Sequence, residues 1–345
     1  MSSSNPHSFP EAGHKLNAFK GACLAGRAFL FALMLLLALP TRAEWFTETQ
    51  DKMGTRVEVQ LWHDDATLAA QLITDAMTEL DRIEDSMSTY RFDSEITYIN
   101  NTAAGKPVIV GDELFGLIER ALQLSVNTDG AFDITYDSVG QFYDYRQKAR
   151  PTEAEIESRV SAINYRYVQL NRETSEIRYT QPGVRINLGG IAKGYAVESV
   201  IALLRKAGVQ HAMVSAGGDT RLLGRRLEKP WIVGVRDPDQ GDGFVTRLAL
   251  DNEAVSTSGD YERFFIEDGV RYHHILNPST GKSAGDVRSV TVIGPDATMT
   301  DGLSTSVFVL GPQAGLALIE SLAGYETVIV DKEHRVIFST GLDPR

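Results

Sequence analysis

The sequence predicts an α+β fold with mixed sheets and packed helices. Segments with a helical period and segments with a strand period both recur, but they do not alternate one for one as in a βαβ protein. The chain has 345 residues, 43% hydrophobic and 23% charged, a composition typical of globular proteins that bury a core. One large domain and two closely packed lobes are both compatible with this length.

Helices are predicted by apolar spacing and by capping signals. Ala66–Met87 repeats apolar residues every three or four positions, as an amphipathic helix does. Thr152 and Glu155 form a capping box, which predicts a short helix that runs toward Ile163. Gly208 is a natural left-handed cap. The other predicted helices are Asp112–Ser125, Ile191–Ala207, one that starts within Thr300–Leu310, and Pro312–Leu322.

Strands are predicted by alternation and by short apolar runs between turn residues. In Met53–Trp62, Val57, Val59 and Leu61 share one face of a half-buried strand. The other predicted strands are Tyr167–Leu170, Ile177–Thr180, Val184–Leu188, Val209–Ser215, Trp231–Val235, Phe264–Ile266, Val287–Ile293 and the hairpin of Thr327–Val330 with Val336–Phe338.

The first 43 residues differ from the rest of the chain. They carry four basic residues and one acidic residue, which gives a net charge of +3. Since the whole chain has a net charge of −12, residues 44–345 have a net charge of −15. The apolar run Ala28–Leu39 follows Arg27 and is closed by Pro40 and the small residue Ala43, which is the pattern of a secretory signal. The run spans about 18 Å as a helix, short of the roughly 30 Å bilayer core, which favours a cleaved signal over a permanent membrane span.

We therefore expect residues 1–43 to be a signal segment and residues 44–345 to be one exported, periplasmic domain, which is inner-membrane-associated if the signal is retained. The acidic balance disfavours nucleic acid as a partner. The only cysteine, Cys23, precludes a disulfide framework and a cysteine-based metal site, and it precedes the apolar run, unlike a lipoprotein acylation site.

Common catalytic motifs are missing. Gly281-Lys282-Ser283 resembles the end of a P-loop, but Leu276 stands where the upstream glycine is required, so Asn277–Gly281 is interpreted as a reverse turn. The sequence contains no Gly-x-Gly-x-x-Gly, Gly-x-Ser-x-Gly or His-Glu-x-x-His. These absences disfavour a standard dinucleotide-binding unit, a serine hydrolase and a zinc protease.

Two glycine-rich turns stand where predicted strands end. Leu188–Gly194 leads into a helix, where backbone N–H groups can hold anionic oxygen, and Lys193 adds a positive charge. The alternative is a tight strand-to-helix connection with a surface lysine. Ser215–Asp219 follows the next strand, so both turns could face one ligand.

Two further sets of polar residues suit chemistry. Asp301 and Thr305 are four apart in a predicted helix, which puts a carboxylate and a hydroxyl on one face, as magnesium ligation requires. The alternative is helix capping by Thr300 or Asp301. His273 and His274 are adjacent on a strand and point to opposite faces, so only one can act as a base in a given site.

Taken in order, these segments resemble the ApbE family, the flavin transferases that move FMN from FAD onto a threonine or serine of another protein. The likeness covers nearly all of residues 50–340. It is carried by Met53–Thr55, Ser88–Tyr90, Ser94–Ile96, Asp129–Thr135, Asn187–Glu198, Ser215–Asp219, Thr257–Tyr261, His274–Gly281 and Asp301–Thr305.

The resemblance implies an ApbE-like fold and a role for each matching position. Mg²⁺ would be held by the backbone oxygen of Gly190 and the side chains of Asp301 and Thr305, with Ser304 as a further candidate. His274 would be the base near the acceptor hydroxyl. FAD would be the substrate, and its site would be lined by Met53, Tyr90, Ala131, Phe132, Asp133, Asn187, Lys193 and Leu276.

Two positions depart from the family pattern, which usually has Asp where this chain has Asn187 and often where it has Asn277. Neither change touches the implied metal ligands. The implied reaction transfers FMN to an exported acceptor and releases AMP. The implied partners are flavin-acceptor subunits of sodium-pumping quinone reductase, Rnf-type and respiratory reductase complexes. The alternatives are an FAD pyrophosphatase that yields FMN and AMP, and a non-catalytic flavin-binding protein.

Overall fold

The computed structural model describes residues 43–239 and 243–342. The predicted signal segment, residues 1–43, lies outside the described residues except for Ala43. The main sheet has eight strands in the order β1-β2-β6-β7-β10-β15-β16-β17, and every neighbouring pair is antiparallel. These strands are β1 (Glu44–Lys52), β2 (Thr55–His63), β6 (Ala212–Ala216), β7 (Asp219–Leu223), β10 (Ala254–Gly259), β15 (Val287–Gly294), β16 (Glu326–Asp331) and β17 (Val336–Phe338).

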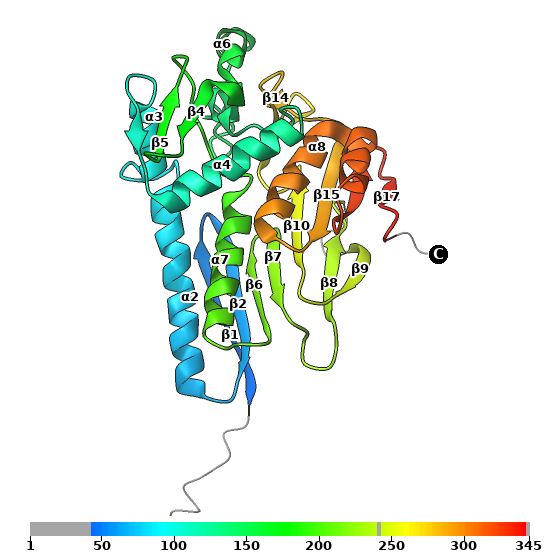
Figure 1. Ribbon diagram of the computed structural model, residues 1–345. Coiled ribbons are helices and arrows are strands. Elements are labelled where there is room, and N and C mark those ends of the chain that lie inside the picture. The colour runs from blue at the N-terminus through cyan, green and yellow to red at the C-terminus, as the bar shows by residue number, and fades with distance from the viewer. Residues whose placement is uncertain (1–42, 240–242, 343–345) are drawn as a thin grey trace, which may run out of the picture. The chain divides into compact units, whose positions relative to one another are not determined.

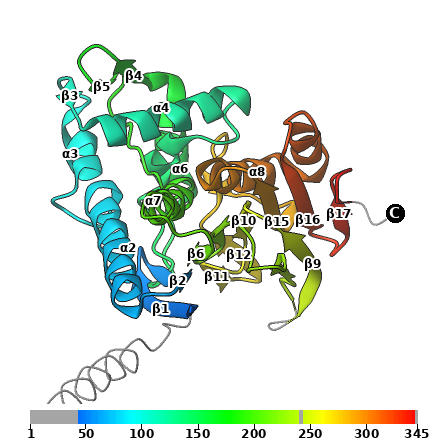
Figure 2. The ribbon, with the colours of Figure 1, turned by 60° about the horizontal axis from the view of Figure 1, so that its bottom comes forward.

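Three long helices cover one face of this sheet, as Figures 1 and 2 show. They are α2 (Ala66–Met87) over β1 and β2, α7 (Ala192–Lys206) over β6 and β7, and α8 (Ala297–Glu320) over β10, β15 and β16. The helix α4 (Asp112–Asn127) contacts α8. The shorter helices are α3 (Glu95–Thr102), α5 (Asp137–Gly140) and α6 (Glu153–Arg159), with 3-10 turns at Ile134–Tyr136, Val160–Ala162 and Tyr165–Tyr167.

Four small sheets complete the described fold. One has the order β3-β5-β4, and the other three are two-stranded ribbons. Their strands are β3 (Val108–Ile109), β4 (Val168–Asn171), β5 (Glu176–Tyr179), β8 (Trp231–Arg236), β9 (Phe244–Leu250), β11 (Phe264–Glu267), β12 (Val270–His273), β13 (Leu276–Asn277) and β14 (Lys282–Ser283).

Alternation along the main sheet divides its apolar side chains between two clusters. Val57, Val59 and Leu61 of β2 are fully buried in the larger cluster beneath the helices. Leu222 of β7 and Val255 of β10 belong instead to a second cluster, which packs against the ribbon β8–β9. The sheet is therefore covered on both faces in this region, which confirms an α+β architecture.

Most predicted elements are present. The helix predicted at Ala66–Met87 has those bounds, and Asp65 caps it. The capping box of Thr152 and Glu155 is formed at the start of α6. Gly208 has φ +90° after α7, as a left-handed cap requires.

The strand predicted at Val184–Leu188 is wrong. The segment does alternate buried residues, because its chain passes between packed elements, but it joins no ladder among the described strands. Some of its backbone groups bond to side chains: the amide of Asn100 donates to Ile186 O at 2.8 Å, and Arg185 N donates to Ser138 Oγ at 3.0 Å. Asn187 N donates to the backbone oxygen of Ile134, in a 3-10 turn, at 2.9 Å. The alternation of apolar residues therefore indicated correctly that side chains are buried, but it did not indicate pairing with another strand.

The two helical segments predicted near the C-terminus are both present within α8, and Gly311 (φ 79°, ψ 176°) breaks the helix between them. Asp296 caps it through Met299 N, so Thr300 and Asp301 are interior residues and the capping alternative is wrong. Within the described residues, α8 is the one helix long and apolar enough to suit a membrane span, with a mean hydropathy of 1.4, but 56% of that window is buried in the protein. It is the central core helix.

Candidate functional site

The N-terminal turns of α7 and α8 pack closely enough to bring predicted site residues together. A Cβ at Gly194 would lie 2.1 Å from Ala297 O and 2.6 Å from the Cβ of Asp301, so only glycine fits this crossing. Gly194 N donates to Asp301 Oδ2 at 2.9 Å. The backbone of the glycine-rich turn is thereby fixed to the carboxylate on α8.

A half-buried lysine links both glycine-rich turns to α8. The ammonium of Lys193 forms an ion pair with Asp219 Oδ2 and lies 3.8 Å from Asp301 Oδ2. The two carboxyl side chains are almost completely buried. The prediction that the turns Leu188–Gly194 and Ser215–Asp219 could face one position is thus consistent with this contact.

The charges of this cluster shift one another's proton affinity. Burial, and then the charge of Asp219, raise the pKa of Asp301, while Lys193 opposes the rise. Burial lowers the pKa of Lys193, but the carboxylates of Asp219 and Asp301 outweigh it and raise that pKa above its usual value. The lysine is therefore protonated at neutral pH, and the cluster gains from any further cation beside Asp301.

Hydroxyl groups surround the other end of the same helix face. Thr305 Oγ1 lies 3.3 Å from Ser258 Oγ on β10, and Ser304 Oγ lies 2.8 Å from that same oxygen. A Cβ at Gly190 would be 3.3 Å from Thr305 Oγ1 and 3.3 Å from the ring of Phe132. Gly190, Asp301 and Thr305, the three predicted metal ligands, thus lie along one seam between α7 and α8.

These donors fit magnesium by chemistry, since a carboxylate, a hydroxyl and a backbone carbonyl are all hard oxygen ligands. The buried carboxyl of Asp301, with its raised pKa, is also better stabilised as an anion by a nearby cation. Among the residues that the structure describes, no cluster of three His, Cys, Asp or Glu side chains suits a metal ion. A metal here would rest on one carboxylate.

The two neighbouring histidines have different environments, but only His273 lies on a strand as predicted, since β12 ends there and His274 is in the bend that follows. His273 is buried, bonds to Ala284 O through Nε2 at 2.6 Å and packs edge-on against Phe308. Nδ1 of His274 is buried and has no hydrogen-bond partner among the described residues. Burial, and then the charges of Arg263 and Lys193, lower the pKa of His274 to about 3. His274 is thus the neutral histidine with a free nitrogen.

Arg263 is a site residue that sequence reasoning missed. Its backbone oxygen accepts from His274 N at 3.2 Å, and its guanidinium lies 3.3 Å from Gly54 O. It has no carboxylate within 4.0 Å in the part of the chain described here. No motif marks it, because its place depends on the β1–β2 turn, more than two hundred residues earlier in the chain.

Met53 belongs to that turn and is held by α2. Its N–H donates to Glu84 Oε2 at 2.7 Å, and its φ of 51° is the left-handed value of a tight hairpin turn. The Met53 side chain is half-buried against the main core. The next residue, Gly54, contacts Arg263. Because the backbone of Arg263 is hydrogen-bonded to His274, Met53 and His274 lie in the same region of the protein.

Asn187 ties three segments together. Its Nδ2 donates to Thr89 Oγ1 at 3.1 Å and to Asp137 Oδ1 at 3.2 Å, while its Oδ1 accepts from Gly189 N at 2.8 Å. Thr89 precedes Tyr90, whose side chain is 87% exposed. The loop that carries Tyr90 is therefore fixed beside the glycine-rich turn, with its ring free to contact a ligand.

The segment Ala131–Asp133 is a tight turn after α4. Asp133 accepts from Thr135 N and Thr135 Oγ1 through Oδ1, and from Tyr165 N through Oδ2. The Asp133 carboxylate is thus occupied in holding the turn, and burial raises its pKa. The ring of Phe132 in this turn lies against Gly190, at the seam between α7 and α8.

Leu276 begins the ribbon β13–β14 and packs in a small cluster with Val139, Tyr143 and Ile156. The turn interpretation of Asn277–Gly281 is confirmed, since Asn277 O accepts from Gly281 N at 2.8 Å and Gly281 has φ +66°. The side chain of Asn277 accepts from Ser279 N. This geometry is a reverse turn and not a P-loop.

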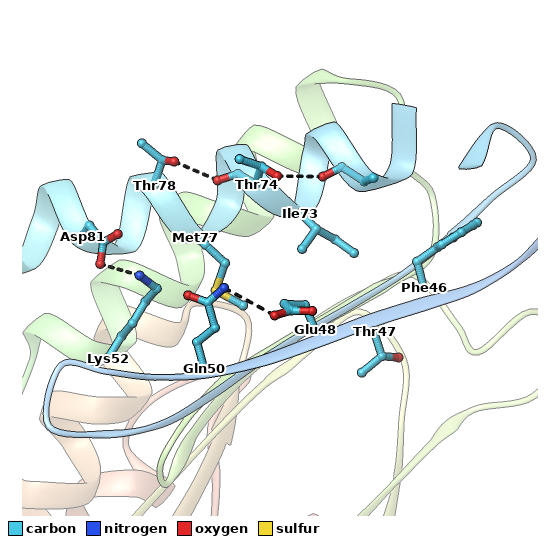
Figure 3. Close-up of a pocket in the computed structure, with 11 residues that line it drawn as sticks. Phe46, Thr47, Glu48, Gln50, Lys52, Ile73, Thr74, Met77, Thr78 and Asp81 are labelled. Carbon is cyan, nitrogen blue, oxygen red and sulfur yellow. Dashed lines mark hydrogen bonds and ion pairs between the residues drawn. The ribbon is translucent and has the colours of Figure 1, made fainter. Parts of the chain in front are cut away.

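A separate pocket of about 520 Å³ lies between β1 and α2, and Figure 3 shows its polar lining. An ion pair of Lys52 with Asp81 lies at one end, and Phe46, Ile73 and Met77 are among the apolar residues of the lining. None of the predicted site residues lines it. The site is therefore defined by the α7–α8 seam and not by this pocket.

The family model described as the ApbE family matches residues 53–329, which include every predicted site residue. The chain belongs to the ApbE family. Curated relatives in this family include the FAD:protein FMN transferase of Vibrio cholerae, 31% identical over 85% of this chain and 89% of the relative. The enzyme of the same name from Treponema pallidum is 31% identical over 88% of this chain and 89% of the relative.

Solved ApbE structures share the fold. The ApbE protein of Thermotoga maritima superposes with a TM-score of 0.80 at 33% identity, covering 86% of this chain and 98% of that one. The flavin transferase ApbE of Vibrio cholerae superposes with a TM-score of 0.78 at 28% identity, covering 88% and 99%. The resemblance and the ApbE-like fold predicted from the sequence are thereby confirmed.

Proposed function

We propose that this chain is an FAD:protein FMN transferase that transfers FMN from FAD onto a Thr or Ser hydroxyl of an exported acceptor protein and releases AMP. Membership of the ApbE family and the names of its relatives support protein flavinylation. The observation that carries the proposal is the seam between α7 and α8, where Gly190, Lys193, Asp301 and Thr305 converge.

The reaction is a phosphoryl-type transfer. The acceptor oxygen forms a bond to the phosphorus of the FMN half, and the bond from that phosphorus to the bridging oxygen breaks, so that AMP leaves with the bridging oxygen. The hydroxyl proton must go to a base, because a neutral hydroxyl is a poor nucleophile. We assign this role to His274, because its buried Nδ1 has no hydrogen-bond partner among the described residues and is free to accept a proton.

Magnesium would be held by Asp301, Thr305 and the backbone oxygen of Gly190, with Ser304 beside them. It would screen the charge of the diphosphate and of the leaving phosphate. In addition to the metal ion, the side chains of Lys193 and Arg263 supply positive charge near the proposed site. Since residues 44–345 carry −15, local cations are needed to hold an anionic substrate.

The flavin and adenine rings would be packed by side chains that the structure leaves accessible at this edge. The exposed ring of Tyr90 and the half-buried Met53 suit stacking on a flat heterocycle. Asn187, which holds the Tyr90 loop, and the turn of Ala131, Phe132 and Asp133 shape the opposite wall. Leu276, which is buried at the start of the ribbon β13–β14, would support the site from that side.

We further propose that residues 1–43 direct export, so that the enzyme acts in the periplasm, attached to the inner membrane if the segment is retained. Its partners would be flavin-acceptor subunits of sodium-pumping quinone reductases, Rnf-type complexes or respiratory reductases. The signal pattern at Ala28–Leu39 and the family membership support this.

The test compares AMP release from FAD with and without an acceptor domain of a sodium-pumping quinone reductase. We expect magnesium-dependent AMP release only when the acceptor keeps its threonine, and none when that threonine is replaced by valine. AMP release at the same rate without any acceptor would identify an FAD pyrophosphatase instead. Flavin binding with no AMP at all would identify a carrier.

The base is tested with His274→Gln. We expect kcat to fall about 100-fold, which is the usual contribution of a general base, with the dissociation constant of FAD little changed. His211→Gln, outside the site, is the control and keeps full activity. Unchanged kcat in His274→Gln would remove His274 from the mechanism.

A further inference from the structure

Lys193 sits between two carboxylates but forms a close ion pair with only one of them. Its ammonium contacts Asp219 Oδ2, whereas its distance to Asp301 Oδ2 is 3.8 Å. Asp219 is the first residue of β7 and is 1% exposed, so its carboxylate is held by the sheet. The family roles assigned above give Asp219 no part in the reaction.

The two carboxylates differ in what else they bind. Asp301 Oδ2 already accepts from Gly194 N at 2.9 Å, at the start of α7. Within the described parts of the chain, the Asp219 side chain forms a hydrogen bond with the lysine alone. The Lys193 ammonium is therefore more strongly stabilised in contact with Asp219 than in contact with Asp301. As a result, the side of the Asp301 carboxylate toward Thr305 remains free of a bound cation.

We propose that Asp219 is a positioning residue that holds the Lys193 ammonium away from Asp301 and so keeps that carboxylate available for Mg²⁺. Without the Asp219 charge, Asp301 is the one carboxylate left within reach of Lys193. An ammonium in contact with Asp301 competes with a divalent cation for the same oxygens. The inference rests on the proposed magnesium site.

The experiment measures Mn²⁺ binding to the purified enzyme by electron paramagnetic resonance, with neither FAD nor acceptor present, so that no turnover is involved. We expect Asp219→Asn to raise the Mn²⁺ dissociation constant about tenfold. A dissociation constant unchanged from wild type overturns the inference.

Loss of one negative charge weakens cation binding by its field alone, so the variant is repeated in a Lys193→Met background. If Asp219 acts through the lysine, Asp219→Asn costs about tenfold when Lys193 is present and less than about threefold when it is absent. An equal cost in both backgrounds shows a field effect and overturns the inference.

Asp219→Ser serves if the asparagine variant does not fold, and circular dichroism checks each protein. The inference and the proposed function fail in different ways. If the wild-type enzyme does not bind Mn²⁺, the magnesium site itself is contradicted. If it binds Mn²⁺ but Asp219 has no effect, only the positioning role is wrong.

Discussion

Asn187 makes one hydrogen bond, to Asp137 Oδ1, that an aspartate at the same position could not make, whereas the hydroxyl of Thr89 could turn to donate to a carboxylate. Its Nδ2 donates to Thr89 Oγ1 and to Asp137 Oδ1, and the latter oxygen belongs to a carboxyl held by Arg185. We expect Asn187→Asp to place two carboxylates in contact and to lower the free energy of unfolding by about 1–3 kcal/mol. Thermal unfolding measures the change.

Asn164→Asp is the matched control for this variant. Among the residues that the structure describes, the Asn164 side chain only accepts a hydrogen bond, from Arg166 N at 3.1 Å, and a carboxylate accepts equally well. We expect its stability to stay within about 0.5 kcal/mol of wild type. Equal stability of the two variants would contradict the donor role of Asn187.

The low pKa of His274 makes the fold sensitive to acid. The unfolded chain binds a proton below pH 6.5, whereas the folded protein resists protonation of His274 down to about pH 3, so stability falls as pH decreases through this window. This histidine alone should cost about 1.5 kcal/mol between pH 6.5 and pH 5. We expect His274→Gln to flatten the pH dependence of urea unfolding.

The sequence was sufficient to predict the site residues that belong to motifs, but not those that only the folded chain brings to the site. Asp301 and Thr305 could be paired because four residues in a helix share a face. Asp219 was seen only as the end of a glycine turn, and Arg263 not at all. Their neighbours Lys193 and Gly54 are distant in sequence, so only the assembled sheet brings them together.

At the scale of elements, the close crossing of α7 and α8 sets the site geometry. We expect Gly194→Ala to force the helices apart, because its Cβ would overlap Ala297 O, and to lower stability by about 1–3 kcal/mol. FMN transfer should fall with it, since Asp301 loses its bond to this backbone.

Gly116→Ala in α4 is the control for the crossing. A Cβ there meets nothing within 4 Å, so the helix should gain up to about 1 kcal/mol of stability. Calorimetry on both variants decides the point. A Gly194→Ala protein as stable and active as Gly116→Ala would show that the crossing tolerates a methyl group.

Helices with long regular spacing were predicted well, and extended segments were predicted less well. The bounds of α2 follow from its apolar stripe and from Asp65 as its cap. Strands β1, β7, β9 and β10 were among those missed. β1 is an edge strand and β9 lies in a ribbon, and both leave many side chains exposed. β7 and β10 are central and mostly buried, but polar residues such as Arg221 and Ser256 interrupt their apolar pattern. Val184–Leu188 shows the opposite error, since its buried alternation comes with no strand partner.

At the scale of the whole molecule, the acidic surface opposes an anionic substrate. Residues 44–345 carry −15, and FAD carries a diphosphate, so repulsion should slow their association at low ionic strength. We expect kcat/KM for FAD to rise about twofold or more as salt increases from roughly 10 to 150 mM at constant magnesium. A steady fall over that range would indicate that local cations at the site dominate association.

The most direct measurement is the intact mass of the acceptor domain after incubation with the enzyme, FAD and magnesium. Transfer predicts a mass gain of one FMN on the acceptor, lost with EDTA and lost with Asp301→Asn, while Asp296→Asn, which alters the cap of the same helix, keeps most of the gain. An unmodified acceptor in the presence of released AMP would contradict the transfer of FMN to protein.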